Sequence, residues 1–482
     1  MQIGTGERWV NRTQAGAKAT GRGSSSQQGR QGGGVGRTVA EWMIEGEPSS
    51  DVFAMDVARY GDYTTPDFTR VKVMENYQRR FAITYPNEEL PAARPLHTTP
   101  AYDLWKPQNA VFGAAYGMEV VNYFAPAGEE PYETPSFRRS NAHDIVGAEC
   151  HAVRTGVGLN EIHNFSKFDV TGPGAEAWLN RVLANRMPKI GRITLSPMLN
   201  PLGKLIGDLT VSHIGEDHFQ VTGSYAAQAY HMRWFEGQLP SPGVAIRNVS
   251  DERIGFQIAG PLARDLLARV TNQDLSTANF PFLSVREMAV GELQAIVSRI
   301  SYTGDLGYEI YVLRENQAAL FGILSDAGVE YNLRPFGMRA MMSLRLEKNF
   351  GSWLREYKPD YTAMETGLDR FINFDKGDFI GREAALAERD NPPNRRLVAL
   401  VVEAGDADVW ADEPIWKDDA VVGLVTSGGY AHYVGKSVAL GFVPVEMIAP
   451  GAAFEIEILG ELRPAILITE PLFDPKGERL RG

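Results

Sequence analysis

Hydrophobic and polar residues alternate along this chain in short segments of two different periods, which predicts a mixture of strands and helices. Period-two alternation predicts strands at residues 167–171, 209–212, 218–222, 300–302 and 308–312. Helical spacing places Trp178, Val182 and Leu183 on one face after the turn at 172–174. After Pro335, the apolar positions 338, 341, 342 and 346 predict a second helix, ended by Gly351. The absence of a regular strand–helix–strand period favours a mixed α+β architecture.

The last 90 residues carry a different pattern, because short apolar strands there are separated by glycine turns. A boundary is expected at Asn391-Pro-Pro-Asn-Arg-Arg. Strands follow at residues 397–402, 423–426, 438–443 and 454–458. This rhythm predicts a small C-terminal β-barrel over residues 393–478.

The N-terminal region is predicted to be a leader followed by a connecting segment. Residues 1–33 are rich in Gly, Ser and Gln, which is typical of a disordered leader. A glycine turn at Gly34 and a helix presenting Val39, Trp42 and Met43 should follow. Prolines at 66, 86, 91, 95 and 100 then predict a strapping linker rather than a domain core.

Composition and charge exclude several classes of protein. The net charge of −12 conceals a basic head of +5 over residues 1–37, so the remaining chain is strongly acidic and does not favour a nucleic-acid partner. No apolar run approaches the roughly 20 residues that cross a bilayer, and the N-terminus has no apolar signal segment. A single cysteine, Cys150, excludes an internal disulfide framework and a multi-cysteine metal site. We therefore expect a reducing compartment: the cytoplasm, or the mitochondrial matrix in a eukaryote.

Common catalytic motifs are absent from the sequence. His213 and His218 are five residues apart, so a strand would direct them to opposite faces, and no metal site is expected. The chain has no P-loop and no G-x-S-x-G elbow. The glycines at 32–36 lack a preceding strand and do not predict a dinucleotide-binding fold.

Five separated motifs occur in one order along the chain. They are SPMLNPLGKLIGDLTV at 196–211, RISYTGDLGYEIYV at 299–312, GMRAMMSLRLEK at 337–348, GLDRF with KGDFIGR at 367–382, and GLVTSGGY at 423–430. Together they resemble the aminomethyltransferase (glycine-cleavage T-protein) superfamily from Pro95 to Pro475. The resemblance implies a three-part cloverleaf folate-binding fold over residues 97–385, followed by the barrel.

A narrower resemblance covers the segment before this domain. GGVGRTVAEWMIEGEP at 33–48, YQRRF at 77–81, YPNEE at 85–89 and RPLHTTP at 94–100 are similar to the end of the flavin domain and the connecting region of dimethylglycine and sarcosine dehydrogenases. Residues 34–96 are thus expected to be a remnant of a flavin oxidoreductase domain. We expect the chain to be the folate half of such a protein, truncated or separately encoded, with FAD held only by a separate or missing domain.

Asp208 is the predicted catalytic carboxylate. It lies between Gly207 and an apolar strand, where a charge is costly unless it has a function or a partner. An aspartate that only caps a strand turn is the structural alternative. By resemblance, Asp208 orients the reacting nitrogen of tetrahydrofolate and accepts its proton. Many relatives have an aromatic residue at the position of Leu195. The resemblance therefore does not assign a contact with pterin or substrate to Leu195.

The same resemblance assigns five further residues to folate. Tyr302 should pack on the ring, and Glu309 should accept hydrogen bonds from the amino-pyrimidine edge of the pterin. The alternative for this pair is an aromatic and a charge on an ordinary hairpin. Arg339 is expected to contact the pterin or the tail carboxylate, while Trp353 and Arg355 are expected to stack on the tail or pair with it. Arg345 and Glu347 are expected to form structural pairs.

The resulting hypothesis is capture of a methylene unit from an oxidised N-methyl amine of dimethylglycine or sarcosine type, giving 5,10-methylenetetrahydrofolate. The expected partners are this small amine or iminium donor and a flavoprotein, and the cofactor is tetrahydrofolate. Two alternatives stay open. One is a demethylase that makes methyltetrahydrofolate from a small sulfonium or amine, and the other is a non-catalytic folate-binding accessory protein.

Overall fold

A computed structural model describes residues 25–46, 48–239 and 242–482, which form two compact units that divide after Gly61. In the first unit, helix α2 (Ser25–Glu45) runs through Gly34 without a turn. The predicted turn is therefore wrong, and residues 25–33 of the predicted leader are helical. Glycine lowers helix stability by about 1 kcal/mol but permits helical dihedral angles. The rest of the predicted leader lies outside the described residues.

The second unit begins with a helix where a proline-rich linker was predicted. Helix α3 (Pro66–Gln78) starts with Pro66 at its first position, and the Thr65 side chain accepts a hydrogen bond from the Phe68 amide. A proline is tolerated there because its missing N–H would have no partner within the helix. The linker prediction is therefore wrong for residues 66–78. The later prolines, at 86, 91, 95 and 100, do lie in irregular chain.

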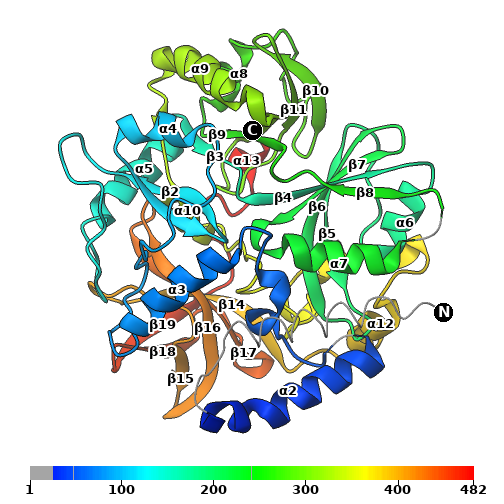
Figure 1. Ribbon diagram of the computed structural model, residues 1–482, viewed down its shortest axis with the longest axis vertical. Coiled ribbons are helices and arrows are strands. Elements are labelled where there is room, and N and C mark those ends of the chain that lie inside the picture. The colour runs from blue at the N-terminus through cyan, green and yellow to red at the C-terminus, as the bar shows by residue number, and fades with distance from the viewer. Residues whose placement is uncertain (1–24, 47, 240–241) are drawn as a thin grey trace. The chain divides into compact units, whose positions relative to one another are not determined.

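Two sheets and a hairpin form the body of the second unit (Figure 1). The hairpin pairs β1 (Ala110–Ala115) with β2 (Met118–Phe124). The six-stranded sheet has the order β10 (Val285–Val290), β11 (Leu293–Ser298), β12 (Gly307–Leu313), β9 (Arg253–Ala259), β3 (Gly158–Glu161), β13 (Arg334–Pro335). The five-stranded sheet has the order β5 (Ile193–Leu199), β6 (Leu205–Gly215), β7 (His218–Ser224), β4 (Phe165–Thr171), β8 (Ala245–Asn248).

A closed six-stranded barrel follows, as predicted for the C-terminal part. Its order is β14 (Arg395–Val402), β17 (Lys436–Pro444), β16 (Ala420–Ala431), β15 (Pro414–Lys417), β18 (Ala453–Ile458), β19 (Glu461–Ile468). Closure leaves no strand edge unpaired. Alternate residues such as Leu400, Ile415, Val425 and Ile456 fill its interior.

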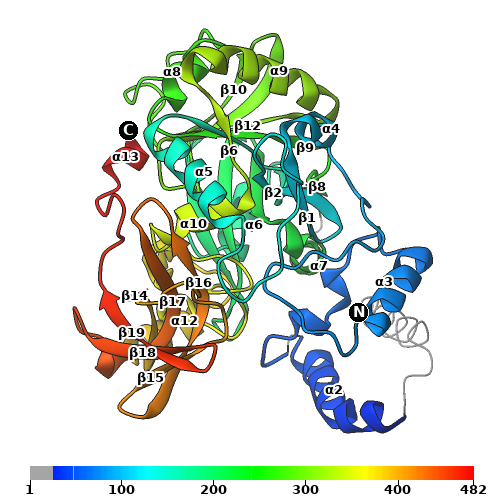
Figure 2. The same ribbon diagram turned by 90° about the vertical axis from the view of Figure 1, so that its left-hand side faces the viewer.

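Helices cover the sheets and connect them to the barrel. They are α4 (Tyr102–Trp105), α5 (His143–Thr155), α6 (Ala175–Val182), α7 (Gln228–Gln238), α8 (Ala263–Ala268), α9 (Gln317–Gly328), α10 (Met338–Leu346), α11 (Ala363–Thr366), α12 (Arg382–Asp390) and α13 (Glu478–Arg481). Helix α10 contacts α5, β2 and β16, so within the second unit it joins the body formed by the two sheets and the hairpin to the barrel. After β19 the chain leaves the barrel and returns along the sheets of the second unit to α13 (Figure 2). In the part of the chain that is described, every helix is too short or too polar to cross a membrane.

Two local predictions differ from the structure. Residues 300–302 form no strand, because the hydroxyls of Ser301 and Thr303 accept hydrogen bonds from the amides of Thr303 and Asp305 (both 3.3 Å). Such local bonds compete with strand pairing. The helix expected to end at Gly351 ends at Leu346, since Asn349 adopts a left-handed φ of 54°.

Lys376 closes the C-terminal end of α6 and gives a first testable prediction. Its Nζ donates to the carbonyls of Asn180 (2.6 Å), Leu183 and Asn185 (2.8 Å). Burial lowers the pKa of this ammonium to about 7. Lys376→Met should lower the free energy of unfolding by about 2 kcal/mol, because carbonyls at the helix end lose a charged donor. Urea titration followed by circular dichroism measures the change, and the exposed Lys436→Met variant should stay within about 0.5 kcal/mol of wild type. Equal stability of the two variants would contradict this role.

Candidate functional site

Asp208 lies on β6, opposite Pro197 of β5, and is half-buried. Burial raises the pKa of its carboxyl to about 8, and the nearby carboxylate of Glu356 adds to this rise. No side chain in the described part of the chain donates a hydrogen bond to it. A carboxyl group with a pKa near the working pH can accept and return a proton.

Two tyrosines lie near Asp208 and Glu356. Tyr302 and Tyr357 each lie close enough for the charge of Asp208 to raise the pKa of their hydroxyls, in addition to the larger effect of burial. The Tyr302 hydroxyl donates to the carbonyl of Gly351 (2.7 Å), and its ring stacks on Phe350 at 6.1 Å between centroids. The structure therefore brings together the predicted Asp208 and Tyr302.

Glu356 is buried and held in place by three donors. Its Oε2 accepts from the Ser352 amide (2.9 Å) and the Arg345 guanidinium (3.4 Å), and its Oε1 accepts from the Thr426 hydroxyl of the barrel (2.6 Å). Arg345 is thus a structural partner, as predicted. These contacts of Glu356 join the barrel to the loop after α10. They hold its carboxylate near Asp208.

Trp353 lies in an aromatic group next to this cluster. Its ring packs against His231 (5.2 Å) and Tyr230 (5.9 Å), and only 7% of its surface is exposed. The indole Nε1 is buried without a hydrogen-bond partner among the described residues. An unpartnered buried donor is costly, which is consistent with a ligand that supplies the acceptor.

Glu309 lies on β12 and is almost fully buried. Its Oε2 accepts from the Tyr311 hydroxyl at 2.7 Å. Burial raises the pKa of this carboxyl to about 7, while the hydroxyl of Tyr311 and the charge of Lys167 oppose the rise. Lys167 is itself completely buried on β4, and its pKa falls to about 7 for the same reason. The side chains of the two sheets thus meet around one carboxylate and one amine.

Arg339 and Arg355 line a different space, a pocket of about 380 Å³ between α5, α10 and the barrel. This volume lies in the range of small-molecule sites. Arg339 is paired with Glu133 (3.2 Å) and Asn87, whereas Arg355 is exposed with no partner among the described residues. Arg345 lines the same pocket and contacts Glu356, so the pocket adjoins the Asp208 cluster.

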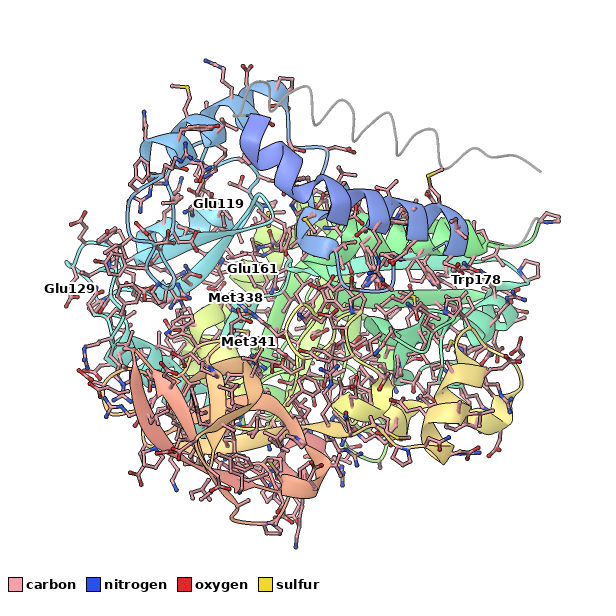
Figure 3. All side chains as sticks on the ribbon, turned by 90° about the horizontal axis from the view of Figure 1, so that it is seen from below. Glu119, Glu129, Glu161, Trp178, Met338 and Met341 are labelled. Atoms are coloured by element: carbon pink, nitrogen blue, oxygen red, sulfur yellow. The ribbon has the colours of Figure 1, made fainter. Side chains whose placement is uncertain are left out.

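The predicted residues therefore fall into three neighbouring groups rather than one. Asp208 and Tyr302 share a cluster beside Trp353, Glu309 lies in the polar layer between the sheets, and Arg339 and Arg355 line the pocket. No contact among the described residues joins Glu309 directly to Asp208. A separate cavity of about 10 Å³ lies between Glu161 and Met338, both labelled in Figure 3. It has room for about one water molecule.

Neither a metal site nor a reactive thiol is found in the described residues. Their His, Cys, Asp and Glu side chains form no group that could hold a metal ion. Cys150 is fully buried, and burial raises the pKa of its thiol. The glycines at 32–36 lie within α2 and form no phosphate-binding turn.

Comparison with known families places these sites in context. Residues 101–376 match the GCVT N-terminal domain, and residues 395–474 match the glycine cleavage T-protein C-terminal barrel domain. The chain belongs to the glycine cleavage T-protein family. Within it, the two sheets and α10 form the N-terminal domain, and β14–β19 form the barrel. Residues 45–99 match a further family, the FAD dependent oxidoreductase central domain.

Relatives of this T-protein family member include dehydrogenases and transferases. The chain is 36% identical to human mitochondrial dimethylglycine dehydrogenase over 93% of its own length and 52% of that protein. It thus spans about half the length of this curated relative. An aminomethyltransferase of Desulfitobacterium hafniense is 28% identical over 68% of this chain and 90% of its own length. The crystal structure of aminomethyltransferase T from Bartonella henselae superposes with a TM-score of 0.69 at 23% identity, covering 79% of this chain and 99% of that one.

Two residues of this site were missed in the sequence. Lys167 falls in an alternating strand, where a lysine normally points to solvent, so its burial has no local signal. Glu356 lies in an irregular loop, and its contacts with Arg345 of α10 and Thr426 of the barrel form only in the folded chain. Both surroundings include segments that are distant in sequence.

Proposed function

We propose that this T-protein family member transfers a one-carbon unit to tetrahydrofolate, taking methylene from an oxidised N-methyl amine of dimethylglycine or sarcosine type. The observation that carries the proposal is Asp208, a carboxyl group with a raised pKa of about 8 among Tyr302, Tyr357 and Glu356. In the reaction, two folate nitrogens bond to the methylene carbon of the iminium. Its carbon–nitrogen bond to the amine breaks, and the amine leaves with the two protons of those nitrogens.

Asp208 has the properties needed to move one of these protons. As a carboxylate it accepts the proton of the attacking nitrogen, and its raised pKa lets it pass that proton to the leaving amine. Tyr302 and Trp353 supply aromatic surface beside it, and the unpartnered Trp353 Nε1 supplies a donor. Glu309 offers a carboxylate to the amino-pyrimidine edge of the folate ring.

We further propose that a flavin-dependent oxidoreductase supplies the oxidised amine, either in a longer form of this chain or as a separate protein. The match of residues 45–99 to the central domain of such enzymes supports this partner. The glycines at 32–36 lie inside a helix and do not fit a flavin phosphate, so the flavin would bind to other residues. A cytoplasmic or mitochondrial location stays a prediction.

Calorimetric titration with tetrahydrofolate tests the proposal through Glu309. Glu309→Gln should weaken binding by about tenfold or more, because a charged acceptor becomes a neutral one. Since the pKa of Glu309 is raised to about 7, its carboxylate form is lost as the pH falls. Wild-type affinity should therefore drop between pH 8 and pH 6, and the variant should show a flatter dependence.

The control for this titration is Glu129→Gln at an exposed position (Figure 3). It should bind tetrahydrofolate like the wild type. Failure of the wild-type protein to bind tetrahydrofolate at all would refute the proposed function.

A further inference from the structure

A row of buried polar side chains crosses the six-stranded sheet at the level of Glu309. Ser298 of β11, Glu309 of β12, Gln257 of β9 and Asn160 of β3 occupy directly opposite positions in three successive antiparallel pairs. Residues opposite one another in such pairs direct their side chains to the same face. All four are at least nine-tenths buried. The face that carries Glu309 is therefore unusually polar for the interior of a sheet.

Gln257 is held in one orientation by its neighbours. Its Nε2 donates to the Ser301 hydroxyl oxygen (3.2 Å), which also accepts from the Thr303 amide (3.3 Å). The Ser301 and Thr303 hydroxyls bond to one another at 2.7 Å. With its amide nitrogen engaged, Gln257 directs its Oε1 away from Ser301. That oxygen is fully buried and accepts no hydrogen bond from the described residues.

Glu309 presents a second acceptor beside it. Tyr311 occupies Oε2 of the carboxylate, and Oε1 accepts nothing from the described residues. Gln257 and Glu309 are directly opposite on neighbouring strands, where Cβ atoms lie about 5 Å apart. Gln257 Oε1 and Glu309 Oε1 thus belong to side chains on the same face of the sheet, and neither accepts a hydrogen bond from the described residues. A buried acceptor such as Gln257 Oε1 is normally satisfied, so its lack of a donor indicates a ligand with N–H groups.

The spacing matches one chemical group in particular. A primary amino group on a pyrimidine ring directs two hydrogens about 120° apart, and its ring-conjugated nitrogen is a poor acceptor. With hydrogen bonds of about 2.9 Å, two acceptors that satisfy it lie about 5 Å from one another. The Cβ atoms of opposite residues on neighbouring strands, as Gln257 and Glu309 are, have about this spacing. A ring nitrogen with a single hydrogen would leave one of the two acceptors unpaired.

We propose that Gln257 is a specificity-determining residue that binds the exocyclic amino group of the folate ring together with Glu309. Each side chain accepts one of the two hydrogens. The inference rests on the proposed function, because it assumes that the ligand is a folate. The inference adds to the proposed function a residue that distinguishes a 2-amino ring from analogues without that amino group.

Calorimetry with two ligands tests this assignment. Gln257→Leu should bind tetrahydrofolate about tenfold more weakly than wild type, since it loses one buried hydrogen bond. The same variant should bind 2-desaminotetrahydrofolate within about twofold of wild type, because that ligand has no hydrogen for Gln257 to accept. A purely structural role would weaken both ligands equally, and that result would overturn the inference, as would unchanged binding of both.

Asn160→Leu is the matched control, as it removes another buried amide from the same row. Asn160 lies one strand further from Glu309, about 4.8 Å beyond Gln257. It should not alter the preference for tetrahydrofolate over the desamino analogue. An equal loss of preference in this variant would contradict a specific role for Gln257.

A measurement on the wild-type protein covers the case in which Gln257→Leu does not fold. Methylation of the amino group removes one of its two hydrogens, so 2-methylaminotetrahydrofolate should bind about tenfold more weakly than tetrahydrofolate. Equal binding would overturn the inference. If tetrahydrofolate binds and Glu309→Gln weakens it while Gln257→Leu does not, the proposed function stands and only the role of Gln257 fails.

Discussion

Replacing Asp208 with asparagine should slow one-carbon transfer by roughly two to four orders of magnitude while tetrahydrofolate still binds. Asparagine keeps the size of the side chain but cannot take up a proton. The neighbours of Asp208 include Tyr302 and Tyr357, whose burial raises the pKa of their hydroxyls above the usual value. Both hydroxyls are therefore protonated at neutral pH and cannot replace Asp208 as the proton acceptor.

The pH dependence of wild-type activity should report the same carboxyl group. Burial and Glu356 raise the pKa of Asp208 to about 8, so most of it is protonated at pH 7. Because the carboxylate is the form that accepts a proton, kcat/KM should rise as the pH increases through about 8. In Asp208→Asn this rise should vanish from the residual rate.

A single-turnover assay measures both effects. Tetrahydrofolate is mixed with an N-methyl amine that a separate amine oxidase converts to the iminium, and an excess of aldehyde trap removes free formaldehyde. Methylenetetrahydrofolate is the expected product, whereas methyltetrahydrofolate would favour the demethylase alternative. Asp217→Asn, at an exposed turn between β6 and β7, should behave like the wild type. If Asp208→Asn keeps the full rate, Asp208 is not the proton acceptor.

Replacing Arg154 with methionine should lower the free energy of unfolding by about 3–5 kcal/mol, the largest stability effect expected in this chain. Arg154 is completely buried and donates to Glu347 (2.7 and 3.0 Å) and to the Thr303 carbonyl (2.9 Å). It also faces Asp305 at 3.4 Å, and its guanidinium stacks over Phe473 at 3.6 Å. Without Arg154, Glu347 is left as a buried charge without its cation.

The same substitution should loosen the turn that connects Tyr302 and Glu309. Asp305 lies in this turn and binds both Arg154 and Arg479 of the C-terminal tail (2.9 Å). Proton uptake by Glu347, whose pKa is already raised by burial, would relieve part of the penalty. The destabilisation should therefore be smaller at pH 5 than at pH 8.

Guanidinium titration of Arg154→Met against the double variant Arg154→Met/Glu347→Leu measures this effect. The double variant removes both charges and should recover part of the lost stability. A double variant less stable than the single one would contradict an unpaired charge as the cause. Loss of less than about 1 kcal/mol in Arg154→Met would show that the network contributes little.

Most of the fold follows from short-range pattern. The strands β4, β6, β7 and β12, the helix after Pro335 and the C-terminal barrel were all predicted, because their apolar residues recur at the period of the element. The errors lie where local chemistry opposes the pattern. Ser301 and Thr303 bond to nearby amides instead of a strand, and Pro66 begins a helix instead of a linker. These outcomes depend on side-chain hydrogen bonds that periodicity does not describe.

The candidate site divides in the same way. The motifs of the sequence determined the family and the barrel, and they predicted Asp208, Tyr302 and Glu309 as site residues, whose roles in binding and catalysis stay predictions. Only the tertiary structure decided which side chains surround them. Lys167 and Gln257 lie beside Glu309 on other strands, and the pKa of Asp208 is raised by burial and by Glu356, which the barrel and Arg345 hold in place. Periodicity determines the face of a strand on which a residue lies, but its neighbours depend on strand order and register, which form between segments far apart in the chain.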